Sequence, residues 1–216
     1  MSVTKYNVAK IAGGTRILTP WFRAAFASVF QPAKPMDPTK EGKYEITLLL
    51  DEKNVDITAL KAAVYECAKA KFGGKIPASP TYDLPPWCNS PFHAGEEKPD
   101  YDGYEGMTYF RASSKFAPQV IDANRVEIGA LDQPGLYSGC IARATVSPWA
   151  YDTSQRKGVS FNIHNLQKLA EGAAFGSARV DAGDEFDAAD DFEGPAISQG
   201  SNDGYGGEQA EHDWLD

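Results

Sequence analysis

The chain has 216 residues, enough for one domain with an appendage or two very small domains, and too few for a large multidomain enzyme. It is 42% hydrophobic and 24% charged, its mean hydropathy is -0.41, and it lacks the run of about 18 apolar residues that a membrane-spanning helix needs. The formal net charge of -9 argues against a polyanionic ligand, because affinity for phosphate backbones comes from Lys and Arg.

The charge is unevenly distributed along the chain. Residues 181–216 contain 12 Asp and Glu and no Lys or Arg, whereas residues 1–180 contain 21 basic and 18 acidic residues, a net charge of +3. Segregation of this kind is typical of an interaction tail. We therefore expect a domain over 1–180 and a disordered acidic tail over 181–216, where apolar residues are too few to offset the entropy of ordering.

The first half of the chain predicts strands and one helix. Residues 15–30 predict an irregular strand, and 43–50 (KYEITLLL) predict a strand whose buried face carries Tyr44, Ile46, Leu48 and Leu50. Residues 56–71 have the apolar spacing of an amphipathic helix, with Asp56 as N-cap and Gly73 as its stop. The helix is expected to bury Leu60, Ala63, Val64 and Cys67.

The second half predicts a long loop followed by more strands. Residues 75–106 are rich in Pro, Asn, Asp and Gly, which indicates an ordered loop of the kind that often contacts ligands. Strands are predicted at 107–114, 119–122, 137–147 and 158–165. With five or six strands and one early helix, the fold class is mainly β: a small antiparallel barrel.

Catalytic and metal-binding patterns are weak. Three cysteines and three histidines lack the close pairing of zinc ligands, and the phosphate-binding glycine motifs of nucleotide enzymes are missing. Asp100, Asp102 and Glu105 could hold Mg²⁺ in a nuclease, but their Pro- and Gly-rich surroundings favour a solvated turn. We expect no enzyme activity, no cofactor and no metal.

One face of the strand at 137–147 combines an aromatic residue with a cation. The even positions are small or apolar and fit a packed interior, whereas the odd positions place Tyr137, Ile141 and Arg143 on the other face. Aromatic rings stack on nucleobases and arginine pairs with phosphate. Tyr137 and Arg143 are therefore candidate nucleic-acid contacts, unless this face packs on a second core.

Two further segments repeat the combination. Trp149 and Tyr151, followed by Arg156 and Lys157, predict an aromatic hairpin tip with adjacent cations, as in single-strand binders, although a hairpin tryptophan can also serve packing alone. In 107–116, alternation places Tyr109 and Arg111 on one face, followed by Lys115, and places Phe110 in the core. The candidate nucleic-acid contacts thus also include Tyr109, Arg111, Lys115, Trp149, Tyr151, Arg156 and Lys157.

The acidic tail ends in a bulky apolar pair. Trp214 and Leu215 follow Asp213 in EHDWLD, a pattern that suits a short linear hook in which charge steers and the indole anchors into a partner. The alternative is a tail that only increases solubility.

These motifs resemble a known family. GKYEITLLL, YFRASSK, YSGCIARATVSPWAYD and KGVSFNIHNLQKLAEGAAFG, followed by an Asp- and Glu-rich terminus, resemble in that order the bacteriophage single-stranded DNA-binding proteins of the OB-fold type. The resemblance implies a five-stranded barrel that binds single-stranded DNA without strong sequence preference, in phage DNA replication, recombination and repair. It also implies a tail that contacts replication proteins such as DNA polymerase and competes with DNA. Such tails commonly end on an aromatic residue, whereas this chain ends Trp214-Leu215-Asp216.

Single-stranded DNA is therefore the expected partner, and no membrane is expected. The N-terminal residues lack a secretory signal, so we expect the cytoplasm, that of the host cell for a phage protein. The chain could act as a monomer or a dimer. Alternatives are a protein-interaction module or DNA mimic that acts through the acidic tail, a nuclease, and a strand-annealing protein.

Overall fold

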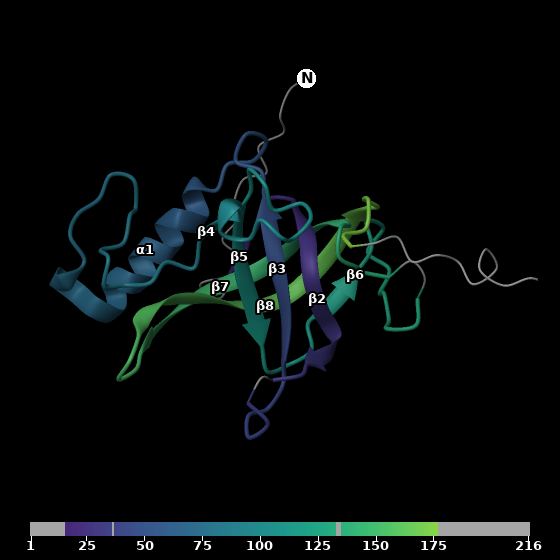
Figure 1. Ribbon diagram of the computed structural model, residues 1–216, viewed down its shortest axis with the longest axis horizontal. Coiled ribbons are helices and arrows are strands. Elements are labelled where there is room, and N and C mark those ends of the chain that lie inside the picture. Colours follow the sequence, from purple (N-terminus) through teal and green to yellow (C-terminus); the bar gives the residue numbers. More distant parts are fainter. Residues whose placement is uncertain (1–15, 36, 133–134, 177–216) are drawn as a thin grey trace, which may run out of the picture. The chain divides into compact units, whose positions relative to one another are not determined.

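Strands dominate the residues that the computed structural model describes, which are 16–35, 37–132 and 135–176 (Figure 1). The expected tail, with Asp213, Trp214 and Leu215, lies outside these ranges. The elements in chain order are β1 (Ile17–Leu18), β2 (Phe22–Ala33), β3 (Lys43–Leu50), α1 (Thr58–Phe72), η1 (Gly73–Lys75), β4 (His93–Ala94), η2 (Gly95–Glu97), β5 (Thr108–Ser114), β6 (Gln119–Ile121), β7 (Ile141–Asp152) and β8 (Lys157–Ala170).

Five of these strands close into a barrel. They pair in the order β7, β2, β3, β5 and β8, and β8 pairs back onto β7. The β5–β8 junction is parallel, with Ala112 opposite Phe161, and the other four junctions are antiparallel. The predicted mainly β fold with a five-stranded barrel is thus confirmed, with one parallel seam. That seam exists because β6 and β7 separate β5 from β8 in the chain, so β8 need not return antiparallel to β5.

Alternating apolar residues fill the barrel. On β3 the expected residues Ile46, Leu48 and Leu50 are fully buried, while Tyr44 near the strand's start is only half-buried. The rings of Phe110 on β5 and Phe161 on β8 meet at 4.5 Å between centroids. Small residues of β7 in the same core, Ala142, Ala144 and Val146, leave room for these rings.

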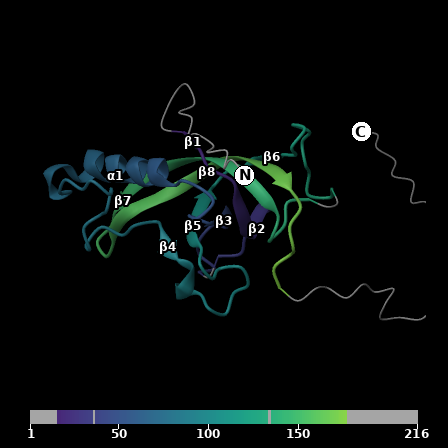
Figure 2. The same ribbon diagram turned by 90° about the horizontal axis from the view of Figure 1, so that it is seen from above.

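The helix lies beside the β7–β8 hairpin, away from β2 and β3 (Figures 1 and 2). It begins one residue later than the Asp56 cap would give, but the Asp56 carboxylate still accepts a hydrogen bond from the Thr58 amide at 2.9 Å. Gly73 ends it with φ of 60°, a conformation that favours glycine. The buried stripe includes the expected Leu60 and Val64 together with Tyr65 and Ala68, and Ala63 and Cys67 lie half-buried at its edge.

The strand predicted at 137–147 begins later and extends further. Gly139 has φ of 113° and turns the chain, and a Cβ on it would lie 2.2 Å from the Ala173 carbonyl oxygen. Tyr137 therefore precedes β7 and does not share its alternation. The inward positions Cys140, Ala142, Ala144 and Val146 are buried as predicted.

The hairpin formed by β7 and β8 is longer than predicted and reaches past the barrel (Figure 1). Its turn is closed by Thr153, whose hydroxyl donates to the Arg156 carbonyl oxygen at 2.9 Å.

Among the described residues, no helix has the length and apolar content that a membrane span requires.

Removing the Phe110 ring tests the barrel core. Phe110 is fully buried against Phe161 and Phe92, so Phe110→Ala should lower the free energy of unfolding by about 3 to 5 kcal/mol in urea titrations. Phe116, with 81% of its surface exposed, is the matched control, and Phe116→Ala should change stability by no more than about 0.5 kcal/mol. Equal effects of the two substitutions would contradict this core.

Candidate nucleic-acid interface

A groove of about 740 Å³ crosses the outer face of the barrel. Its walls come from β2, β3 and β5 on one side, from the β7–β8 hairpin on the other, and from the 75–106 loop. That loop is largely irregular, as predicted, with only short strand and 3-10 segments. We call this hollow the central groove. The lining residues that matter below are Phe26, Glu45, His93, Lys98, Tyr104, Tyr109, Arg111 and Tyr151.

The central groove brings together three of the residues predicted from sequence. Tyr109 and Arg111 share the outward face of β5, and Tyr151 reaches the same hollow from β7. Phe110, between the first two, is fully buried in the barrel as alternation predicts. Residues 40 positions apart in sequence thus line a single surface.

Tyr109 forms part of the groove floor. Only 8% of its surface is exposed, because His93 stacks on it at 5.2 Å and Tyr104 meets it edge-on at 5.1 Å. Burial raises the phenol pKa of both Tyr104 and Tyr109. The two tyrosines therefore remain neutral at physiological pH and give the groove an apolar, uncharged floor.

Two cations near the groove, Arg111 and Lys115, are paired with carboxylates, whereas the Lys98 ammonium lies 5.0 Å from the Tyr101 ring centroid. Arg111 Nη1 lies 3.5 Å from Glu45 Oε1, and both residues also line an adjoining hollow of about 530 Å³. Lys115 lies in that second hollow, with its Nζ 3.8 Å from Glu41. Exposed pairs of this kind contribute about 0 to 1 kcal/mol. An incoming phosphate could therefore replace the carboxylates at small cost.

Trp149 and Tyr151 form an aromatic pair beside the groove. Their ring centroids are 5.7 Å apart, and Trp149, which is 40% exposed, pairs across the hairpin with the groove residue Ser160. Both aromatic residues lie within β7, so the prediction that they form the hairpin tip is wrong. The strand continues past Pro148 because Pro148 still has a register partner, Phe161 on β8.

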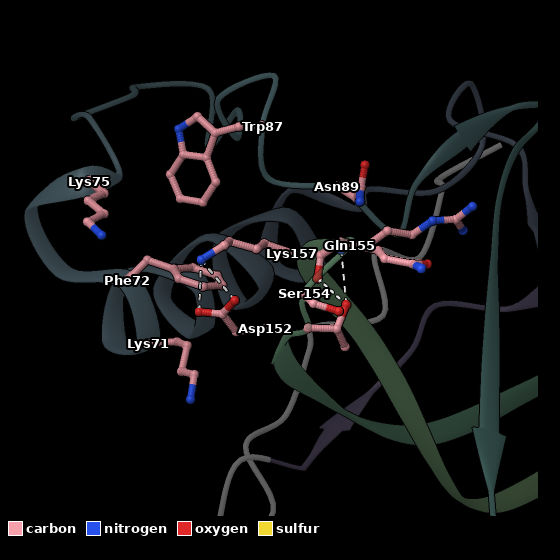
Figure 3. Close-up of a pocket in the computed structure, with 11 residues that line it drawn as sticks. Lys71, Phe72, Lys75, Trp87, Asn89, Asp152, Ser154, Gln155 and Lys157 are labelled. Carbon is pink, nitrogen blue, oxygen red and sulfur yellow. Dashed lines mark hydrogen bonds and ion pairs between the residues drawn. The ribbon is translucent and has the colours of Figure 1, made fainter.

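Arg156 and Lys157 lie at the end of the hairpin. They line a separate hollow of about 850 Å³ between the hairpin turn, the end of α1 and the following loop (Figure 3). We call it the hairpin pocket. Lys157 Nζ contacts Asp152 at 2.9 Å.

Tyr137 and Arg143 are placed outside these hollows. The Tyr137 phenol oxygen lies 2.8 Å from Glu171 and accepts a hydrogen bond from the Gly172 amide, while the Lys168 ammonium lies 5.2 Å from its ring centroid. Hydrogen bonding from Lys168 and Tyr137 lowers the pKa of Glu171. Arg143 Nε donates to Gln167 Oε1 on β8 at 2.8 Å. Both predicted residues thus make contacts that secure β8 and the segment after it.

Phe26 is a groove residue that the sequence did not reveal. It has φ of 48°, which is rare for a bulky residue, at an irregular position in the pairing of β2 with β3. Its amide donates to Ser138 Oγ at 3.0 Å. Half of its surface is exposed, beside Tyr101 at 5.2 Å. No local motif signals this geometry, because Ser138 lies 112 residues away.

The 75–106 loop is held over the hairpin at one point. The Asn89 amide donates to the Lys157 carbonyl oxygen at 2.9 Å, and the Asn89 carbonyl oxygen accepts from the Val159 amide at 3.0 Å. Gly158 lies between them, where a Cβ would be 2.6 Å from the Asn89 oxygen and 2.7 Å from Tyr151 Oη. A glycine here lets the loop approach closely enough to place Ser90 and His93 in the groove.

The carboxylates considered for a nuclease are not arranged as a metal site. Among the described residues, no group of three or more His, Cys, Asp or Glu could hold a metal ion. Asp102 instead accepts a hydrogen bond from the Gly176 amide at 3.1 Å.

Comparison with protein families gives a match over most of the chain. Residues 15–195 match the family described as Enterobacter phage Enc34, ssDNA-binding protein. A curated relative, putative protein p50 of Acyrthosiphon pisum secondary endosymbiont phage 1, is 34% identical over 171 residues, which cover 76% of this chain and 89% of that protein.

Solved structures share the fold. The single-stranded DNA-binding protein of bacteriophage Enc34, in complex with ssDNA, matches with a TM-score of 0.61 and 22% identity over 75% of this chain and 90% of that one. Gp2.5, a single-stranded DNA-binding protein encoded by bacteriophage T7, matches with a TM-score of 0.52 and 18% identity over 85% of this chain and 98% of that one.

Gly158→Ala should release the loop from the hairpin. The added methyl group displaces Asn89, so the amides of Asn89 and Val159 should lose hydrogen bonds worth about 1 kcal/mol each and exchange with solvent about fivefold faster or more. Hydrogen exchange followed by NMR measures this directly. Gly74→Ala is the control, because a Cβ there meets nothing within 4 Å, and it should leave both amides unchanged. Unchanged exchange in Gly158→Ala would show that the loop does not need this close approach.

Proposed function

We propose that this chain, which belongs to the family of the Enterobacter phage Enc34 ssDNA-binding protein, binds single-stranded DNA in the central groove without strong sequence preference. The observation that carries the proposal is the groove itself, which gathers Tyr109, Arg111 and Tyr151 from separate strands into one hollow. The presence of ssDNA in the solved structure of the Enc34 protein supports it.

In this mechanism the bases stack and the phosphates pair with cations. Phe26, Trp149 and Tyr151 offer partly exposed rings at the rim, and every base has a face that can stack on them. Arg111 and Lys115 lie where a backbone phosphate could take the place of Glu45 and Glu41. Because stacking and phosphate contacts do not read base edges, binding would tolerate any sequence.

The remaining predicted residues divide into two groups. Arg156 and Lys157 at the hairpin end would meet the backbone of a strand that extends past the groove. Tyr137 and Arg143 would not contact DNA, because their side chains bond within the barrel, to Glu171 and to Gln167. We propose a binding protein without catalytic activity, cofactor or metal.

The sequence resemblance described above supports a wider role. We propose that the chain protects single-stranded DNA during phage replication, recombination and repair in the host cytoplasm. Residues 1–180 would form the DNA-binding domain. The acidic segment 181–216 would compete with DNA for the cations and would recruit replication proteins such as DNA polymerase through Asp213, Trp214 and Leu215.

Substitutions inside and outside the groove test the site. Tyr151→Ala should weaken binding by about 1 to 3 kcal/mol, one lost stacking contact, in fluorescence anisotropy titrations with labelled oligothymidylate. Arg111→Gln should reduce the slope of log K against log salt by about 0.7, one phosphate contact. Arg143→Gln, an arginine on the same barrel but outside the groove, should leave both the affinity and the slope near wild type.

Other results would favour other functions. A larger loss in Arg143→Gln than in Arg111→Gln would move the DNA path to the other end of β7. If the protein bound no oligonucleotide even without residues 181–216, the interaction-module alternative would replace this proposal. Loss of full-length oligonucleotide only when Mg²⁺ is added would indicate a nuclease.

Deleting residues 181–216 should increase DNA affinity. The tail carries 12 acidic residues and no basic ones, and its covalent attachment gives it a high effective concentration near the cations. The gain should be largest at low salt and shrink as salt screens the charges. Full-length protein with Trp214→Ala is the control: it keeps the charge, so its DNA affinity should remain that of the wild type. Equal affinity of the truncated and full-length proteins would rule out competition by the tail.

A further inference from the structure

The hairpin pocket is built from three segments that are far apart in sequence. Phe72 ends α1, Trp87 belongs to the following loop, and residues 152–157 form the turn end of the β7–β8 hairpin (Figure 3). Asn89 fixes the loop to the hairpin through its two backbone hydrogen bonds. Next to Trp87, Cys88 is buried in the main core. The pocket walls are therefore tied to the barrel.

An aromatic surface lines one side of this pocket. The Trp87 and Phe72 rings meet edge-on, with centroids 5.4 Å apart and an interplanar angle of 88°. Phe72 also packs against the main core, which fixes the orientation of the pair. Trp87 still keeps 42% of its surface exposed. An oriented, half-exposed indole in a hollow is suited to stacking on a flat ring.

Cations without carboxylate partners surround the indole. Four basic residues line the pocket against a single acidic one, Asp152, which pairs with Lys157. Across the described part of the chain, the side chains of Lys71, Lys75 and Arg156 form no ion pair. The balance is closer in the central groove and its adjoining hollow, where Arg111, Lys40 and Lys115 each have a carboxylate neighbour. Of the other described lysines there, Lys34, Lys43 and Lys98 form no ion pair. The hairpin pocket therefore carries a net positive charge, which attracts anions such as phosphate groups.

The pocket lies next to the central groove. Asn89 and Asp152 line the pocket, whereas the residues adjacent to them in the chain, Ser90 and Tyr151, line the groove. The two hollows are separated by the Asn89–Gly158 bridge. A single strand of DNA that leaves the groove at Tyr151 would cross this bridge and enter the pocket.

We propose that the hairpin pocket is a second nucleotide subsite, which holds a base against Trp87 and the neighbouring phosphates among Lys71, Lys75 and Arg156. The proposal rests on the proposed function, because it requires that DNA first occupies the central groove. The pocket adds affinity only to strands long enough to reach it. Short oligonucleotides bind in the groove alone.

The test compares two oligonucleotide lengths, about 6 and about 16 nucleotides, which lie near the two ends of the range for one OB-fold. Trp87→Ala should bind the short oligonucleotide like the wild type and the long one about 5- to 150-fold more weakly, the loss of one stacked base. Trp87→Phe retains a ring and should recover most of that loss. Tyr151→Ala, in the groove, should weaken both lengths.

The charge contribution has a matched control on the same helix. Lys71 lines the pocket and Lys69, two residues earlier in the last turn, does not. Lys71→Gln should lower the salt slope for the long oligonucleotide by about 0.7, and Lys69→Gln should not. As a direct readout, a long oligonucleotide containing 5-iododeoxyuridine should cross-link to Trp87 on irradiation, with the cross-linked peptide identified by mass spectrometry.

The outcomes separate the two proposals. If the wild type binds the short oligonucleotide and the Trp87 and Lys71 variants match it at both lengths, the hairpin pocket is not on the DNA path and only this inference fails. Equal weakening of both lengths in Trp87→Ala and Trp87→Phe would assign Trp87 a structural role and would also overturn it. If the wild type binds neither length, with or without residues 181–216, the proposed function fails and this inference fails with it.

Discussion

Pairing of β7 with β8 is the constraint on which both the barrel and the binding surfaces depend. At its start β7 joins β2 through Ile141 and Ala142, and further along the pair β8 joins β5 through Phe161 and Asn162, which closes the ring. At the other end the same two strands continue past the ring as a hairpin that carries Trp149, Tyr151 and Lys157. Because both ends belong to one ladder, the position of the aromatic pair relative to β5 is set by the barrel's own closure. The barrel itself therefore holds the aromatic pair in place beside the groove.

Two departures from regular strand geometry shape the central groove. At Phe26 the backbone of β2 adopts a positive φ and turns a phenyl ring outward, at a cost of about 1 to 3 kcal/mol. At Gly158 the missing side chain lets the loop backbone bond directly to β8. The first feature supplies a ring at the rim, and the second brings the loop over the floor. Both depend on contacts between segments that are distant in sequence.

Sequence reasoning located the elements better than the site. The period-2 pattern of β3 and the 3.6-residue pattern of α1 reflect local geometry, so they indicated those elements and most of their buried residues. Alternation also assigned Arg143 to the outward side of β7. Arg143 is eight residues from Tyr151, about 27 Å along an extended strand, and the sequence could not show that the groove lies at the Tyr151 end. The face of the strand on which a side chain lies follows from local alternation. The position of that residue relative to the groove depends on the tertiary fold and does not.

The groove and the hairpin pocket differ in how their charges are balanced. Arg111 and Lys115 face carboxylates at 3.5 and 3.8 Å, so a phosphate that binds there exchanges one weak, solvent-screened pair for another. Lys71, Lys75 and Arg156 have no such pair to give up, so the same phosphate gains their full attraction there. Phosphate contacts would therefore contribute more in the pocket, where four cations line the wall with one carboxylate, than at Arg111 and Lys115. The competition proposed for residues 181–216, which carry 12 acidic residues, would be strongest against the cations of the pocket, because an acidic segment supplies charge without bases.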